Sequence, residues 1–365
     1  MGALENTEMQ LLAQPRSWLV TGAGGFIGSH LVERLLSLGQ TVVGLDNFET
    51  GSPDNLRDVL AQVGPEAARH LRFIEGDIRD LSLCRRACAG SNIVLHEAGL
   101  GSVPRSIDDP LSTHQVNIDG FLNMMIAVRD AGVSRFVYAT SSSVYGDRPG
   151  LSKVEHRVGS PRSPYALTKR VNELYAQIFS GLYGVETIGL RYFNVFGRRQ
   201  NPEGPYAAVI PRWIAALLEH KKCVIFGDGE TSRDFCYVEN VLQANLLAAV
   251  AAPRSPAVNQ IYNVGAGKLT TLNRLFATMR GRLAARDPRV RGAKPIYQPF
   301  RPGDVRHSKA NISKARRLLG YAPSHSLSSG LDETIEWYVG CLAGNSASNA
   351  SPRAEPSMSD VNHLA

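Results

Sequence analysis

The chain has 365 residues, a net charge of +7, 43% hydrophobic residues and 20% charged residues, which is typical of a soluble globular protein. It contains no run of about 18 apolar residues, so we expect no membrane insertion, and its first residues lack the pattern of a secretory signal. The densest basic run, residues 280–294, has no interleaved aromatic residues, so we expect no nucleic-acid binding, although the charge suits a nucleotide diphosphate.

The five cysteines are scattered along the chain and form neither a C-x-x-C pair nor a metal-ligand cluster. Their odd number and wide spacing predict reduced thiols, a cytoplasmic location and no metal site.

The first elements follow the order of a dinucleotide-binding fingerprint. An apolar strand at residues 17–21 leads into the glycine turn of residues 22–28 and a helix that ends near residue 38. A second apolar strand at residues 41–45 ends on Asp46. Strand, glycine turn, helix, strand and acid in this order predict a dinucleotide site.

Each residue of this fingerprint has a physical role. Gly22 permits the tight turn, Gly25 lets a pyrophosphate approach the helix N-terminus, and Gly28 allows close packing of helix and strand. The Asp46 carboxylate suits the adenosine ribose hydroxyls and would repel a 2′-phosphate. Because residues 47–49 include no arginine, the sequence favours NAD over NADP.

Further apolar strands are expected at residues 71–75, 92–96, 135–140 and 185–191, separated mostly by helices at residues 81–89, 114–131 and 165–182. This alternation predicts an α/β fold with a doubly wound parallel sheet, a Rossmann-like NAD domain. Asp77 follows its strand at the carboxyl edge, where ligands bind, and is a candidate for contact with adenine. Capping of the next helix is an equally good interpretation.

The helix at residues 165–182 carries the candidate base. Ser163 and Pro164 suit its N-cap and first position, so Tyr165 and Lys169 share one helix face. An ammonium group beside a phenol favours the phenolate, which makes Tyr165 a candidate general base. By itself this spacing is more often a half-buried ring and a solvated stem, so the assignment depends on the other motifs.

The regular alternation ends after residue 194. Residues 198–206 are expected to form a polar loop, and residues 223–226 and 260–264 to form strands, the second of which rejoins the sheet. Helices are expected at residues 207–219, 237–251, 271–283, 313–319 and 331–339. We therefore expect a flexible N-terminal tail (1–16), an NAD-binding domain (17–197, with 230–264), a smaller α/β substrate-binding lobe (198–229 and 265–340) and a flexible C-terminal tail (341–365).

Four motifs together resemble the extended short-chain dehydrogenase/reductases. They are residues 21–28 (TGAGGFIG), residues 141–146 (SSSVYG), Tyr165-x-x-x-Lys169 and residues 191–197 (RYFNVFG). They follow the family's order and spacing, and the similarity covers about residues 17–340. More narrowly, the sequence is similar to the bacterial UDP-N-acetylhexosamine 4-epimerases of surface-polysaccharide synthesis. The resemblance implies NAD, a UDP-sugar substrate and a homodimer.

The resemblance also implies residue roles. Ser141 and Tyr165 would act on the sugar 4-hydroxyl with Ser142 as a helper, and Lys169 would hold the nicotinamide ribose. A hydroxyl at Ser141, just past a strand, can bond both a sugar oxygen and Tyr165. Tyr165 would take the proton while NAD⁺ takes hydride from C4, and the 4-keto sugar would turn over before hydride returns. Further cofactor contacts are expected from Phe26, Ile27, Asn47, Ile78, Ala98, Tyr192 and Val195.

The substrate-binding residues also come from the resemblance. Asn194, Arg233 and Arg301 would meet the diphosphate, since the forked donors of arginine suit phosphate, and Asp304 would meet the uridine ribose. Alone, each arginine is more typical of a surface residue. Ala208, Val209 and Trp213 would line the uracil end, with an apolar helix face as an equal alternative. Other contacts are expected from Gly101, Ser102, Ser143, Gln200, Val224 and Phe226, although Ser143 alone is more typical of a serine-rich turn.

Specificity rests on small side chains. Ser308 stands where related epimerases of unacetylated hexoses carry a bulky aromatic residue, which would leave room for an N-acetyl group. Residues 101–106 resemble the acetyl-sugar enzymes, with an ordinary loop as the other interpretation. The expected reaction interconverts UDP-GlcNAc and UDP-GalNAc, or their uronic acids.

Other functions remain as alternatives. UDP-glucuronate or UDP-glucose 4-epimerase activity would need only a few substrate contacts that differ from those expected for an N-acetylated sugar. Ser142 and Ser143 stand where 4,6-dehydratases need an acidic pair, and the glutamate usual in UDP-xylose-forming decarboxylases is also absent. A non-catalytic NAD-binding regulatory protein would be expected to lack Tyr165 or Lys169, and both are present.

Overall fold

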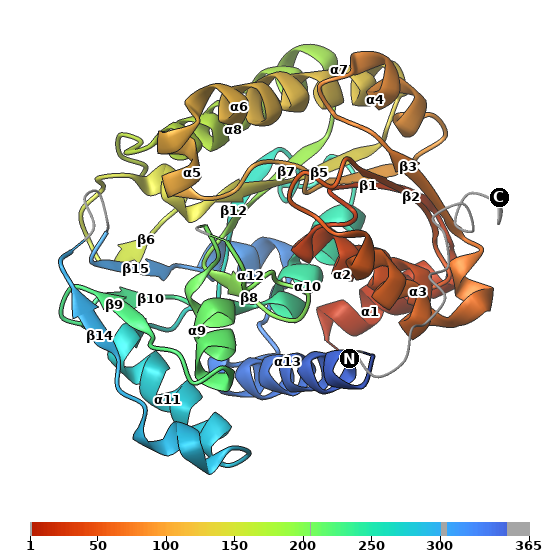
Figure 1. Cartoon of the computed structure of the whole chain (residues 1–365). Helices are drawn as coiled ribbons and strands as arrows, with labels where there is room; N and C mark the ends of the chain where they lie inside the picture. Colours follow the sequence, from red (N-terminus) through yellow and green to blue (C-terminus); the bar gives the residue numbers. More distant parts are fainter. Residues whose placement is uncertain (1, 205, 301–304, 349–365) are drawn as a thin grey trace.

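The computed structural model describes residues 2–204, 206–300 and 305–348, with side chains described as far as residue 341. Its centre is a parallel sheet of seven strands in the order β12-β7-β5-β4-β1-β2-β3 (Figure 1). The strands are β1 (Ser17–Thr21), β2 (Thr41–Asp46), β3 (Leu71–Glu75), β4 (Ile93–His96), β5 (Arg135–Ser141), β7 (Thr187–Tyr192) and β12 (Gln260–Val264). The predicted α/β fold is confirmed, and so is the return of residues 260–264 to the sheet.

Helices cover both faces of this sheet (Figure 1). One face carries α2 (Phe26–Ser37), α3 (Pro53–Ala68), α10 (Val238–Val250) and α12 (Ser313–Leu319), and the other carries α4 (Leu81–Cys88), α5 (Val103–Asp108), α6 (Pro110–His114), α7 (Phe121–Asp130) and α8 (Pro164–Tyr183). Strands covered on both faces are buried along their length, as in β4, where all four residues are buried. This burial explains why the strands are continuous apolar runs in the sequence.

The expected flexible N-terminal tail is wrong. Residues Ala3–Ala13 form α1, which packs against α10. Leu11 is fully buried, and Glu8 forms an ion pair of 2.7 Å with Arg34 of α2. Docking on a distant helix stabilises this segment.

Helix α3 has no counterpart among the predicted elements. It buries only Leu56 and Val59, and it is kinked at Gly64, where φ is 77°. Its residues Leu56, Val59, Leu60 and Val63 follow the helical apolar period after the Ser52 N-cap and Pro53, so the sequence carried a signal for this helix that the prediction missed.

The smaller lobe packs α9 (Val209–Leu218), α11 (Leu272–Ala284) and α13 (Leu327–Ser348) around one apolar core. Its largest sheet has the order β13 (Thr270–Thr271), β10 (Ser232–Arg233), β15 (His307–Ala310) and β6 (Ser152–Lys153). Two short pairs join β9 (Val224–Phe226) to β14 (Ile296–Gln298) and β8 (Val195–Phe196) to β11 (Cys236–Tyr237). Because β6 comes from the first half of the chain, the two lobes share segments.

Two details differ from the predicted boundaries. β10 belongs to the small sheet, although residues 230–264 were expected to join the NAD domain. Helix α13 continues to Ser348, so a flexible tail from residue 341 is wrong for its first eight residues. The remainder of that predicted tail lies outside the described residues.

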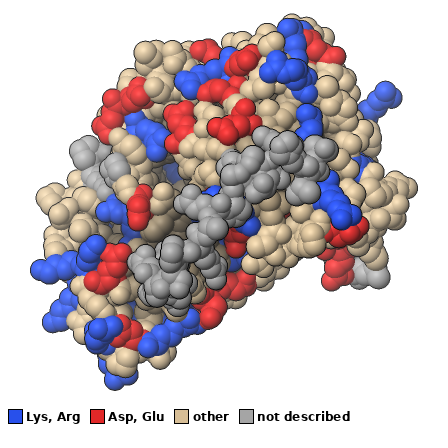
Figure 2. Space-filling view, turned by 45° about the vertical axis from the view of Figure 1, so that its right-hand side comes forward, with Lys and Arg blue, Asp and Glu red and all other residues tan. Residues whose placement is uncertain are grey.

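Charges on the face shown in Figure 2 are mixed, with acidic and basic side chains interspersed. Within the basic run, Arg282 pairs with Asp332 and Arg289 pairs with Asp287. These pairs place an acidic partner beside two of its arginines. In the described part of the chain, no helix is both long and apolar enough to cross a membrane.

Candidate active site

The glycine turn connects β1 with α2 and borders a cavity of about 290 Å³. Gly22 has a φ of 71°, which favours glycine, and a Cβ on Gly28 would lie 2.0 Å from the Gly22 carbonyl oxygen. Gly25 is the N-cap of α2 and no side chain caps this helix, whose first residues Phe26 and Ile27 line the cavity. An uncapped helix N-terminus attracts anions, so the turn fits the pyrophosphate of a dinucleotide.

Asp46 ends β2 beside the turn and is 8% exposed. Its carboxylate accepts hydrogen bonds from the backbone N–H groups of Gly24 (2.8 Å) and Phe48 (2.7 Å). Burial raises the pKa of Asp46, and these backbone hydrogen bonds oppose the rise. The carboxylate is therefore held in a fixed position on the wall of the cavity.

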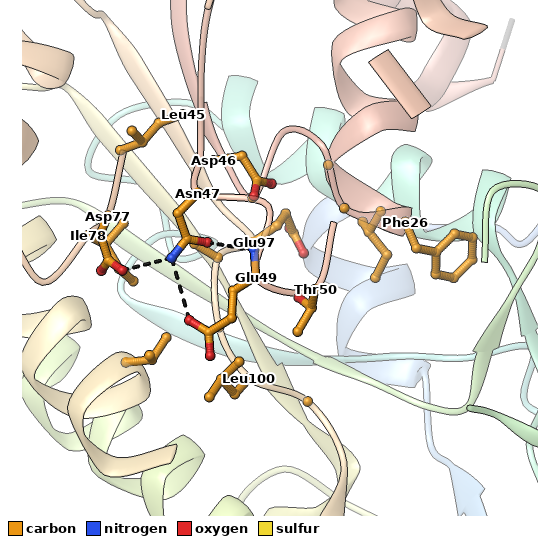
Figure 3. A pocket seen from close by; sticks show the side chains of 18 of the residues that line it. Phe26, Leu45, Asp46, Asn47, Glu49, Thr50, Asp77, Ile78, Glu97 and Leu100 are labelled. Carbon is orange, nitrogen blue, oxygen red and sulfur yellow. Dashed lines mark hydrogen bonds between the residues drawn. The ribbon is translucent and has the colours of Figure 1, made fainter. Parts of the chain in front are cut away.

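Asp77 follows β3 and lines the same cavity, with Ile78 and Ala98. Figure 3 shows Asn47 between Asp77 and Glu49, and Asn47 Nδ2 donates to Asp77 Oδ2 at 2.7 Å. The hydrogen bonds of Arg79 lower the pKa of Asp77. Helix α4 is capped by Asp80, so the capping interpretation of Asp77 is wrong.

A larger cavity of about 940 Å³ shares Phe26, Ile27, Glu97, Gly99 and Gly101 with the first. The predicted residues that line it are Gly101, Ser102, Ser141, Ser142, Ser143, Tyr165, Lys169, Tyr192, Asn194, Val195, Gln200, Arg233 and Ser308. The fold therefore brings most of the predicted site residues into two joined cavities.

Helix α8 begins as predicted. Ser163 is its N-cap, with Oγ accepting a hydrogen bond from the Ala166 N–H at 3.1 Å, and Pro164 is its first residue. Lys169 Nζ donates to the Ala139 carbonyl oxygen of β5 at 3.0 Å. Burial lowers the pKa of Lys169 to about 8. The helix start and this bond to the sheet hold the Tyr-x-x-x-Lys face against the end of β5.

Tyr165 and Ser141 both line the larger cavity, and the Ser141 Oγ accepts a hydrogen bond from Ser143 Oγ at 2.9 Å. Burial raises the pKa of Tyr165, the nearby Ser141 side chain lowers it, and the charge of Glu97 raises it. Lys169 Nζ bonds the Ala139 carbonyl oxygen, and assistance from its charge to Tyr165 stays a prediction. The pair that can relay a proton is therefore Tyr165 and Ser141.

Glu97 was missed by the sequence analysis. It follows β4 directly, and its Oε1 accepts a hydrogen bond from the Tyr192 hydroxyl at 2.7 Å. Burial raises the pKa of Glu97 to about 7. The signal that singled out Asp77, an acid directly after an apolar parallel strand, would also have found Glu97.

In the smaller lobe, Arg233 and Ser308 are partners in the parallel register of β10 and β15, and both line the larger cavity. Arg233 Nη1 donates to the Ser232 carbonyl oxygen at 3.1 Å. Asn194 Nδ2 donates to the Asp234 carbonyl oxygen at 3.3 Å. These contacts hold two candidate phosphate-binding side chains at the wall of the larger cavity.

Five predicted substrate contacts, three of them at the expected uracil end, do not line either cavity. Among the described residues, those that line the two cavities do not include Ala208, Val209, Trp213, Val224 or Phe226. Trp213 is 4% exposed and packs edge-on against Phe276, with its Nε1 donating to the Val224 carbonyl oxygen. For Trp213 the apolar helix face is the correct interpretation. Arg301 and Asp304 lie outside the described residues.

The sequence is similar to those of known sugar-nucleotide epimerases. The model of the NAD dependent epimerase/dehydratase family matches residues 18–265. A UDP-glucose 4-epimerase of Mycolicibacterium smegmatis is 36% identical, over 88% of this chain and 97% of its own length.

Two solved structures share the fold. The UDP-N-acetylglucosamine 4-epimerase of Methanobrevibacter ruminantium, in complex with UDP-N-acetylmuramic acid, has a TM-score of 0.81 and 36% identity over 90% of this chain and 99% of its own. The UDP-glucose 4-epimerase of Thermus thermophilus, in complex with NAD, has a TM-score of 0.76 and 31% identity over 89% and 99%.

Proposed function

The chain belongs to the NAD dependent epimerase/dehydratase family, and from this premise we propose that it is a UDP-sugar 4-epimerase acting on UDP-GlcNAc and UDP-GalNAc, or on their uronic acids. Its cofactor is NAD. The observation that carries the proposal is that Ser141, Tyr165 and Lys169 line one cavity, which is continuous with the cavity at the glycine turn. We further propose a role in surface-polysaccharide synthesis, which rests on the resemblance of the sequence.

The proposed chemistry divides between cofactor and protein. Bound NAD supplies a hydride acceptor for C4 and a donor for the return step. Tyr165, in its phenolate form, takes the proton of the 4-hydroxyl, directly or through Ser141, and returns it after the sugar has turned. Lys169 exchanges its bond to the Ala139 carbonyl for one to the nicotinamide ribose. The net redox change is zero.

The cavity suits a substrate held firmly at one end. Asn194 and Arg233 offer donors to the diphosphate on the smaller-lobe side. Around the sugar the cavity has small side chains, among them Gly101, Ser102 and Ser142. A 4-keto sugar anchored by its UDP can rotate in such a space and receive hydride on its other face.

The acidic groups that line this cavity favour epimerisation over dehydration. Among the described lining residues they are Glu97, which is bonded to Tyr192, and Asp108. Neither stands directly after Ser141, which is where a dehydratase needs an acidic pair to move protons at C5 and C6 of the sugar. UDP-glucose and UDP-glucuronate would use the same proton relay, so the choice between sugars depends on the cavity wall near Ser308.

The first test is product analysis with purified protein and a panel of UDP-sugars. We expect UDP-GlcNAc and UDP-GalNAc to equilibrate without added oxidant, faster than UDP-glucose or UDP-glucuronate, while bound NAD stays unconsumed. Conversion of UDP-glucose or UDP-glucuronate alone would contradict the proposed specificity, and no conversion of any sugar would contradict the activity.

A matched pair of variants in the same assay tests the pocket. Ser308 is 9% exposed beside Arg233, so Ser308→Tyr should crowd an N-acetyl group and lower kcat/KM for UDP-GlcNAc by about 100-fold. UDP-glucose should be affected much less, and Ser308→Ala should keep the wild-type preference. Equal losses for both sugars would remove Ser308 as a specificity residue.

We also propose a homodimer through α8. One face of this helix exposes Leu167, Leu174, Ile178 and Leu182, whose spacings of seven, four and four residues form a single stripe. A contiguous apolar patch marks an interface, and a second copy of this chain can cover it by twofold symmetry. We expect light scattering to give twice the chain mass for the wild type and the single mass for Ile178→Glu. Ile296→Glu, at an exposed apolar residue of β14, should stay dimeric.

A further inference from the structure

Glu97 lies at the junction of the two cavities. It lines both, together with Gly99, Gly101, Phe26 and Ile27. The glycine turn suits the pyrophosphate and Asp46 the adenosine half of NAD. The other half of the cofactor must therefore extend past Glu97 to reach Tyr165.

One oxygen of this carboxylate is fixed by the protein. Asn245 Nδ2 donates to the Tyr192 oxygen at 2.9 Å, so the Tyr192 proton is directed to Glu97 Oε1 at 2.7 Å. The Glu97 backbone N–H donates to the Thr21 carbonyl oxygen at the end of β1. Among the described residues, no side chain or backbone group hydrogen-bonds Oε2. The second oxygen is therefore open to a group in the cavity.

We propose that Glu97 recognises the positive charge of the oxidised nicotinamide ring, so that the site holds NAD⁺ more tightly than NADH. The reduced ring carries no charge, whereas a carboxylate and a cationic ring attract strongly where water is excluded. The inference rests on NAD as the cofactor and not on the identity of the sugar. A site that binds NAD⁺ more tightly than NADH makes the bound NADH a better hydride donor, which favours return of hydride to the keto sugar. Fast return matters because loss of the keto sugar from the site would leave NADH behind.

The titration of Glu97 predicts a pH dependence. Lys169 of α8 is the charged group that acts on Glu97, and its pKa of about 8 keeps it mostly protonated below neutrality. The neighbouring titratable groups Tyr165, Tyr192 and Cys236 have raised pKa values, and His96 has a lowered one, so all are neutral there. A cationic ring favours the carboxylate, so NAD⁺ binding releases a proton below the Glu97 pKa of about 7. NAD⁺ binding should weaken as pH falls through this value.

The test is competitive binding to the full chain. The protein is equilibrated with equal NAD⁺ and NADH, and the bound forms are released and quantified. We expect Glu97→Gln, which keeps an acceptor for Tyr192, to lower the NAD⁺ preference by about tenfold or more at about pH 7.5. The wild-type preference should fall by about five- to tenfold between about pH 7.5 and pH 6, and Glu97→Gln should show no such change.

A second variant separates charge from structure. Tyr192→Phe removes the hydrogen bond that lowers the pKa of Glu97 and leaves the carboxylate, so its preference should persist with a midpoint at higher pH. Equal NAD⁺ preference in the wild type and Glu97→Gln would overturn the proposal. If Glu97→Gln lowered the affinities for NAD⁺ and NADH equally, Glu97 would have a structural role and the proposal would be wrong.

Discussion

Tyr165→Phe is expected to lower kcat by about 10²–10⁴-fold, the usual contribution of a positioned general base. The variant keeps the ring in its half-buried site and removes only the hydroxyl on which Ser141 acts. Bound NAD should be retained, because the glycine turn and Asp46 are untouched. The measurements are turnover with UDP-GlcNAc and the cofactor content of the purified variant.

Tyr175→Phe is the matched control on the same helix. Tyr175 packs against the core on the other side of the sheet from α2 and does not line either cavity. Removing its hydroxyl should leave kcat within about twofold of the wild-type value, because Tyr175 lies away from the reacting groups. Near-wild-type turnover of Tyr165→Phe would remove Tyr165 as the base.

Arg191→Met is expected to destabilise the fold by about 3–5 kcal/mol, because it leaves a buried carboxylate without its main partner. The Arg191 and Glu173 side chains are 1% and 0% exposed and form two hydrogen bonds of 2.7 and 2.8 Å. Glu173 also accepts a hydrogen bond from Thr140 Oγ1 at 2.9 Å. Since Thr140 precedes Ser141, turnover should fall as well. The free energy of unfolding in denaturant measures the loss.

Arg170→Met provides the control for this prediction. Arg170 bonds the same Glu173 carboxylate but its side chain is 32% exposed, so its removal should cost at most about 1 kcal/mol. Similar stability losses in both variants would show that burial of Arg191 is not what makes its ion pair important.

The sheet and the glycine turn were predictable because their signals are local. Buried parallel strands are short apolar runs, and Gly22 and Gly28 occupy backbone positions that leave no room for a Cβ. The start of α8 was also predictable, since Ser163 and Pro164 carry their own capping chemistry. Helix α1 was not, because it buries few residues and depends on its contact with the distant helix α10.

The sequence by itself determined the fold class, the NAD turn and the Tyr-x-x-x-Lys helix, since each depends on residues close together in the chain. Only the tertiary structure decided which side chains share a cavity. It buried Trp213 in the smaller lobe, set Ser308 beside Arg233, and brought Glu97, just past β4, against Tyr192 of β7 and within the electrostatic influence of Lys169 of α8. The physical reason is that desolvation and Coulomb interactions depend on distances in space, which local sequence patterns do not specify.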